Sequence, residues 1–115
     1  MKNSYLYYMK ESYTTRLTFL GTGTSQGVPI IGCGCDVCKS SDNKDKRLRS
    51  SAFIEQNGLR ILIDAGPDFR QQLLRENIGS VDAILLTHEH KDHTGGLDDV
   101  RAINYITRKA LPVYC

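Results

Sequence analysis

The sequence predicts an α/β domain, and three local patterns carry that prediction. Asn57 and Gly58 separate two short apolar segments, which is typical of a β-hairpin closed by a type I′ turn. A further apolar run over residues 81–87 predicts a buried strand. Helical spacing of apolar residues follows each of these strand regions, over residues 67–77 and 96–108. Strands and helices therefore alternate along this part of the chain.

The chain has 115 residues, enough for one domain with a modest core. Lysine and arginine outnumber aspartate and glutamate by 15 to 13, and the formal net charge of +2 points to no particular partner. No apolar run approaches the ~20 residues that a transmembrane helix needs, and the N-terminus lacks the apolar core of a signal peptide. We therefore expect a cytoplasmic protein with reduced thiols.

Residues 1–15 are predicted to form an N-terminal arm, and residues 16–115 the domain. Polar and apolar residues alternate over residues 16–20, which predicts a strand that runs into a glycine-rich loop over residues 21–29. The loop matches neither nucleotide-binding fingerprint. Gln26 stands where the dinucleotide motif needs its last glycine, and the Gly-Lys pair of a P-loop is absent. The expected role is a tight turn whose small side chains let the backbone approach another element or the reaction centre.

Three of the four cysteines form a C-x-C-x-x-C cluster at Cys33, Cys35 and Cys38. Such short spacings favour a shared metal over disulfides, and three thiolates supply most of a closed zinc site. The prediction is a structural zinc whose fourth ligand lies elsewhere, with an iron–sulfur cluster or inert thiols as alternatives. Cys115 is either that fourth ligand or simply a residue of the last strand, predicted to begin at Pro112.

A basic run follows the cysteines. Its cations are Lys44, Lys46, Arg47 and Arg49, with acidic residues interspersed. Most runs of this kind form a solvated face, which is the interpretation we favour. The alternative is that these cations attract an anionic substrate toward a metal site.

Asp64 ends the second strand of the predicted hairpin and precedes the helix over residues 67–77, which is expected to stop at Gly79. One interpretation places Asp64 at a helix N-terminus, where the helix dipole favours a carboxylate. The other interpretation makes Asp64 a carboxylate that orients a metal-binding histidine. The sequence pattern alone leaves both open.

All three histidines lie in the motif H-x-H-x-D-H, directly after the strand predicted over residues 81–87. In an extended segment residues i and i+2 face the same way, so His88 and His90 can share one metal ion. Where the chain turns toward the next helix, the side chains of Asp92 and His93 change direction together, and they can bind a second ion. Imidazole and carboxylate suit Zn, Mn or Fe.

Two alternatives to this metal site have less support. A zincin motif needs a second histidine four residues after His88, but that position is Asp92. A polar loop without function would have to gather three histidines within six positions by accident. A chelating role is therefore the prediction.

An apolar strand followed by H-x-H-x-D-H resembles the signature of the metallo-β-lactamase fold hydrolases. The glycine-rich loop, the cysteine cluster, Asp64-Ala65-Gly66 and the histidine motif together resemble one branch, the phosphoribosyl cyclic phosphodiesterases of phosphonate breakdown and their relatives. This resemblance implies a four-layer αββα sandwich, of which this chain supplies the N-terminal αβ half. It also implies a hydrolase that attacks a cyclic or small phosphodiester with metal-bound hydroxide.

The resemblance further implies roles for individual residues. His88 and His90 would bind the first of two divalent ions, whereas Asp92 and His93 would bind the second and serve catalysis. Asp64 would support this dinuclear site. A structural zinc would be bound by Cys33, Cys35 and Cys38.

Members of this family are usually built of two similar αβ halves. The second half supplies a further histidine for each active-site metal, a bridging aspartate and the histidine of the cysteine zinc site. No histidine follows His93 in this sequence. We therefore expect this chain to be inactive alone, as a fragment of a longer enzyme. Pairing with a second chain, or metal binding without catalysis, are the alternatives.

A tRNA 3′-end endonuclease is the rival enzyme, because those relatives share the glycine loop and the histidine motif. The cysteine cluster fits the cyclic phosphodiesterase branch better, and a long basic arm for RNA is absent. The expected substrate is therefore a small phosphodiester. Nucleic acid is the less favoured alternative, and no membrane is expected.

Overall fold

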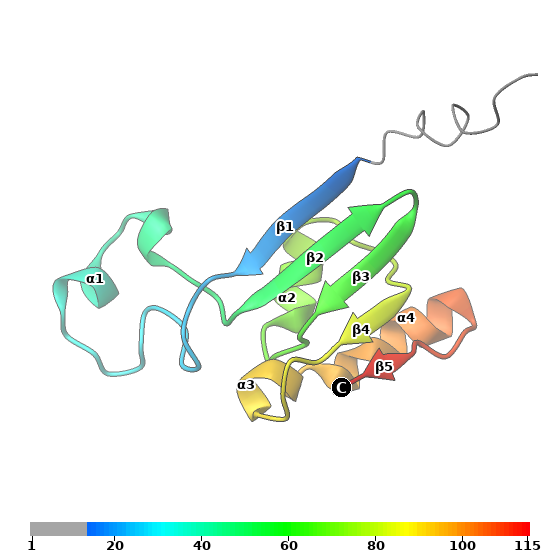
Figure 1. Ribbon diagram of the computed structural model, residues 1–115. Coiled ribbons are helices and arrows are strands. Elements are labelled where there is room, and N and C mark those ends of the chain that lie inside the picture. The colour runs from blue at the N-terminus through cyan, green and yellow to red at the C-terminus, as the bar shows by residue number, and fades with distance from the viewer. Residues whose placement is uncertain (1–13) are drawn as a thin grey trace, which may run out of the picture.

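The computed structural model describes residues 14–115 and shows a five-stranded mixed sheet with helices packed on one face (Figure 1). Its spatial order is β1-β2-β3-β4-β5, with β1 to β3 antiparallel and β3 to β5 parallel. The strands are β1 (Thr15–Gly21), β2 (Ser51–Gln56), β3 (Leu59–Ile63), β4 (Ala83–Leu85) and β5 (Val113–Tyr114). The helices are α1 (Asp36–Lys39), α2 (Phe69–Arg75), α3 (Lys91–Thr94) and α4 (Val100–Thr107), with 3₁₀ turns η2 (Asn43–Asp45) and η3 (Leu97–Asp99).

The N-terminal arm predicted over residues 1–15 lies almost wholly outside the described residues, and β1 begins at its last residue, Thr15. From residue 14 to residue 115, no helix combines the length and the apolar character needed to cross a membrane.

The predicted hairpin is confirmed. Asn57 and Gly58 have φ angles of 50° and 80°, and positive φ at both central residues is what a type I′ turn requires. β2 and β3 pair continuously on either side of this turn, from Gln56↔Leu59 to Ala52↔Ile63. The turn therefore fixes which side chains of both strands face the helices.

The core lies between one face of the sheet and the helices α2 and α4. α2 ends before the predicted stop at Gly79, because Asn77 turns left-handed with φ 55° and the Ile78 amide donates to the Leu73 carbonyl. The predicted helix over residues 96–108 is split into η3 and α4. The buried core residues are Leu20, Phe53, Leu62, Ala65, Phe69, Leu73, Val81, Ile84, Val100 and Ile103.

The opposite face of the sheet is apolar, and no helix of residues 14–115 covers it (Figure 1). Leu17 and Phe19 are 52% and 67% exposed there. The prediction of a buried strand over residues 81–87 is therefore only partly right, because β4 has three residues and Leu85 is 38% exposed. The cross-strand rows of this open face are Leu17–Ile54–Ile61–Ala83 and Phe19–Ala52–Ile63–Leu85–Tyr114.

The connection from β1 to β2 leaves the sheet as a separate lobe that carries α1 (Figure 1). Two isolated bridges, Gly23↔Arg49 and Val28↔Arg47, join the outgoing and returning arms of this lobe. A Cβ atom on Gly21 or Gly23 would overlap backbone carbonyl oxygens of the returning arm. Of the two predicted roles of the glycine-rich loop, the structure shows the first, a close approach of its backbone to another segment.

Candidate metal centres

The sheet topology brings Asp64 and the histidine motif to one edge. β3 and β4 are parallel neighbours with Ile63 opposite Leu85, so their carboxyl ends meet at the same place. Asp64 is the first residue after β3, and the Asp64 amide donates to the Leu85 carbonyl at 2.9 Å. Thr87 and His88 follow β4 at the same edge. The two segments that the sequence singled out are therefore adjacent.

Gly66 allows the turn after Asp64 and the histidine turn to contact each other through their backbones. The Ala65 amide donates to the His93 carbonyl at 2.8 Å, and the Gly96 amide donates to the Ala65 carbonyl at 2.8 Å. A Cβ on Gly66 would overlap the Asp92 carbonyl oxygen. The turn after Asp64 can therefore reach the histidine turn only without a side chain at residue 66.

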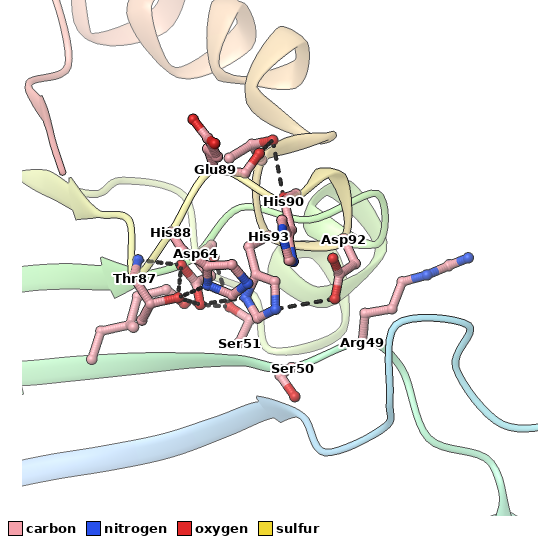
Figure 2. Close-up of polar contacts among 12 residues, drawn as sticks. Arg49, Ser50, Ser51, Asp64, Thr87, His88, Glu89, His90, Asp92 and His93 are labelled. Atoms are coloured by element: carbon pink, nitrogen blue, oxygen red, sulfur yellow. Dashed lines mark hydrogen bonds and ion pairs between the residues drawn. The ribbon is translucent and has the colours of Figure 1, made fainter.

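The predicted ligands of the dinuclear site lie together (Figure 2). The His88 ring centroid is 4.6 Å from that of His90 and 4.0 Å from that of His93. Nε2 of His93 lies 3.0 Å from a carboxylate oxygen of Asp92. Glu89 points away from the cluster, as the alternation of an extended segment predicts (Figure 2). Three imidazoles and one carboxylate thus lie next to one another, and residues of these types suit Zn, Mn or Fe.

The Asp64 carboxylate contacts two residues of the histidine segment, Thr87 and His93. This carboxylate lies 2.7 Å from Nδ1 of His93 and accepts bonds from the Thr87 amide at 2.8 Å and from the Thr87 hydroxyl at 2.8 and 3.0 Å. Asp64 is 4% exposed and has a left-handed backbone with φ 62°. The N-cap position of α2 belongs to Asp68. Of the two interpretations of Asp64, contact with a histidine is the one its geometry supports.

Thr87 is a polar residue of this site that the sequence pattern did not single out. Its hydroxyl lies 2.9 Å from Nδ1 of His88 while also contacting Asp64 (Figure 2). The only signal in the sequence is a threonine at the end of an apolar strand, directly before the first histidine. That signal is weak, because threonine is common in strands.

The cysteine cluster lies in the lobe around α1, apart from the histidines (Figure 1). The Sγ atoms of Cys33, Cys35 and Cys38 lie within 4.8 Å of one another, and none of the three forms a disulfide. Three converging sulfurs fit a tetrahedral zinc that takes a fourth ligand from elsewhere. Cys115 follows β5 on the far side of the sheet from this lobe and is not part of the group (Figure 1).

Backbone amides act differently on these thiols. The Cys38 amide donates to the Cys35 sulfur at 3.4 Å and lowers the pKa of that thiol, and the Cys33 and Cys38 thiols lower it further. At Cys38 the Ile30 amide, which donates to the sulfur at 3.4 Å, works to lower the pKa. Burial and the neighbouring Cys33 and Cys35 thiols outweigh it, and the pKa of Cys38 is raised. Cys35 therefore ionises more readily than Cys38.

The basic run is only partly a solvated face. Arg49 forms an ion pair with Asp68 at 3.1 Å and donates from Nε to the Ser25 carbonyl at 3.0 Å. Arg47 donates to the Thr22 hydroxyl at 3.1 Å. Both arginines therefore tie the cysteine lobe to the glycine-rich loop and α2, a structural role that neither interpretation of the run included.

A two-layer αβ unit with a histidine and aspartate cluster at the carboxyl ends of its strands defines one half of the metallo-β-lactamase fold. The family model described as the beta-lactamase superfamily domain matches residues 59–115, from β3 to the last residue. The chain belongs to this superfamily, and it contains the N-terminal αβ half of the four-layer sandwich.

Within the superfamily, the chain is similar to the crystal structure of a diphosphatase from the PhnP family. The two share 53% sequence identity with a TM-score of 0.84, over 89% of this chain and 42% of the other. An octanoyltransferase of Porphyromonas gingivalis is 57% identical over 100 residues, which are 86% of this chain but 20% of that protein. Because the match leaves most of that protein uncovered, its name assigns no transferase activity to the shared segment.

The structure of human tRNase Z, short form, is 24% identical with a TM-score of 0.64, over 88% of this chain and 34% of the other. That likeness shows the shared fold and nothing finer. The chain spans between 20% and 42% of the length of these relatives.

Proposed function

We propose that this chain is the metal-binding half of a hydrolase that cleaves a cyclic or small phosphodiester. One observation carries the proposal: Asp64 holds His93 by Nδ1, while Nε2 of the same ring lies 3.0 Å from the Asp92 carboxylate. A metal-binding histidine typically donates one ring N–H to a supporting carboxylate and turns its other nitrogen toward the metal and the remaining ligands. Asp64 would be the supporting carboxylate, and Asp92 a further ligand. The similarity to a diphosphatase supports hydrolysis at phosphorus.

Each residue of the cluster has a distinct part in this proposal. His88 and His90 would hold one divalent ion, and Asp92 and His93 a second ion beside it. Such ions lower the pKa of water and stabilise the charge that develops on phosphoryl oxygens. Asp64 keeps the His93 ring in one orientation and leaves its Nε2 facing the cluster. Cys33, Cys35 and Cys38 would bind a zinc that stabilises the lobe.

The open sheet face supports a further part of the proposal, that the site is completed by a second αβ half. Leu17 and Phe19 are more than half exposed on an apolar face that spans all five strands. An apolar surface of this extent normally marks an interface. A C-terminal half, or a second chain, would cover the face and add the missing ligands. This chain alone would then be inactive, and its free thiols fit a cytoplasmic location.

The experiment uses the protein at its natural length. It compares three substrates, and it compares the wild type with a variant of one proposed metal-binding residue. A ribose cyclic phosphate, a nucleoside diphosphate derivative and a precursor tRNA are offered in parallel. The proposal expects the cyclic phosphate to be hydrolysed best, and Asp92→Asn to reduce that activity more than ~100-fold, because losing even a supporting residue costs 10–100-fold. Glu89→Gln is the matched control, since Glu89 points away from the cluster.

Preferred cleavage of the precursor tRNA would replace the proposal with the nuclease alternative. Full activity of the Asp92→Asn variant, or equal losses in both variants, would exclude the proposed site.

A further inference from the structure

We propose that Thr87 is a positioning residue that fixes the tautomer of His88, so that Nε2 of this histidine is the atom left free to bind a metal. The inference rests on the proposed function, because it assumes that His88 is a ligand. It goes beyond that function by assigning a role to a residue outside the H-x-H-x-D-H motif. It also links the two proposed metal positions through one carboxylate.

The Thr87 hydroxyl has a single proton and two hydrogen-bonding neighbours, Asp64 and His88. The Thr87 oxygen lies 2.8 and 3.0 Å from the two carboxylate oxygens of Asp64 and 2.9 Å from Nδ1 of His88. A hydroxyl has one proton to donate and lone pairs to accept, whereas an ionised carboxylate can only accept. The single hydroxyl proton must therefore point to Asp64. The contact with His88 then requires a proton on Nδ1 of the imidazole.

The opposite assignment would be unfavourable. If Nδ1 of His88 carried no proton, the Thr87 hydroxyl would have to donate to it. The hydroxyl oxygen would then face the carboxylate oxygens of Asp64 at 2.8 and 3.0 Å without a proton between them. A hydrogen bond to a charged group would be exchanged for contact between lone pairs. The geometry thus places a proton on Nδ1 of His88, and in the ring that carries this single proton the electron pair lies on Nε2.

The same carboxylate also places a proton on Nδ1 of His93. Nδ1 of His93 lies 2.7 Å from Asp64, which can accept a proton from that nitrogen but cannot donate one. Asp64 therefore controls His93 directly and His88 through Thr87. The two rings lie 4.0 Å apart by their centroids, so both Nε2 atoms belong to one cluster, in which Nε2 of His93 also lies 3.0 Å from the Asp92 carboxylate.

Thr87 can be tested with substitutions that separate its hydroxyl from its shape. Thr87→Val keeps the branched side chain and removes the proton donor and acceptor. Thr87→Ser keeps the hydroxyl and removes a methyl group. We expect Thr87→Val to weaken metal binding at the histidine cluster by about 10–100-fold, as is usual for residues that orient a ligand, and Thr87→Ser to retain affinity within a few-fold.

The first readout is the tautomer itself, measured without metal on the protein at its natural length. Histidine-selective ¹⁵N labelling and ring ¹H–¹⁵N correlation spectra at about pH 8 distinguish a proton on Nδ1 from one on Nε2. A His88→Gln variant assigns the signals. The expected result is a proton on Nδ1 of His88 in the wild type and in Thr87→Ser, and a tautomer mixture in Thr87→Val.

The second readout is calorimetric titration of the same proteins with Zn²⁺ and Mn²⁺. A wild-type proton on Nε2 of His88 would overturn the inference without any variant. Unchanged tautomer and unchanged affinity in a folded Thr87→Val would overturn it as well. If the wild type bound no metal at the histidines, the proposed function would fail, while the tautomer of His88 would still decide this inference separately.

Discussion

Asp64 and His93 are joined by a contact of 2.7 Å between a carboxylate oxygen and Nδ1, although 29 positions separate them in the sequence. Asp64 is 4% exposed, so little water competes for its carboxylate. This contact links the end of β3 to the turn after β4. It is the point at which the fold and the proposed chemistry depend on the same residue.

Asp64→Asn should weaken metal binding at the histidine cluster by about 10–100-fold, because an amide orients the His93 ring less firmly than a carboxylate does. Asparagine tolerates the left-handed backbone of this position, with φ 62°, so the fold should persist. Titration with Mn²⁺, followed by calorimetry, measures the change. Asp68→Asn is the control, since Asp68 pairs with Arg49 instead of a histidine. Equal effects of the two substitutions would contradict the role given to Asp64.

Cys33→Ser should remove about one zinc ion per chain, because a tetrahedral site that loses a thiolate binds zinc far more weakly. Metal at the histidine cluster should be unaffected, since the cysteines lie in a separate lobe (Figure 1). Elemental analysis of the purified protein measures this directly. Cys115→Ser provides the matched control and should leave the zinc content unchanged, because Cys115 lies outside the three-thiol group. Zinc loss in both variants would place Cys115 among the ligands.

Gly66→Ala should lower the free energy of unfolding by about 1–3 kcal/mol, the usual range for overpacking. The added Cβ would overlap the Asp92 carbonyl oxygen, so the two turns would have to separate. Urea unfolding of the natural-length protein measures the loss. Gly79→Ala is the control, because no heavy atom lies within 4 Å of a Cβ built there, and it should change stability by less than ~0.5 kcal/mol. Similar costs at both glycines would argue against the close approach.

Phe19→Ala should cost the natural-length protein about 3–5 kcal/mol in unfolding free energy, the range for truncating a fully buried phenylalanine. In this chain Phe19 is 67% exposed, so a cost of that size requires a second half to cover it. Tyr105→Ala on α4, where the side chain is 86% exposed, should have little effect. Denaturant unfolding compares the two. A small cost at Phe19 would mean that the open face stays uncovered in the complete protein.

The local elements of this fold follow from short stretches of sequence. Asn57 and Gly58 specify their turn because few residues accept two consecutive positive φ angles, and that constraint is entirely local. The order of strands and helices likewise follows from local periodicity. The end of α2 was predicted less well. Asn77 ended the helix before Gly79 did, because an asparagine also tolerates the left-handed conformation.

Sequence alone determined the chemistry of the chain: three thiols at short spacings, and three histidines with an aspartate at the end of an apolar strand. Residue types and spacings of this kind limit which metals can bind, whatever the fold. Only the tertiary structure decided that Asp64 meets His93 and that Thr87 lies between Asp64 and His88. The physical reason is the parallel pairing of β3 with β4, which places the ends of two strands side by side although they are distant in sequence.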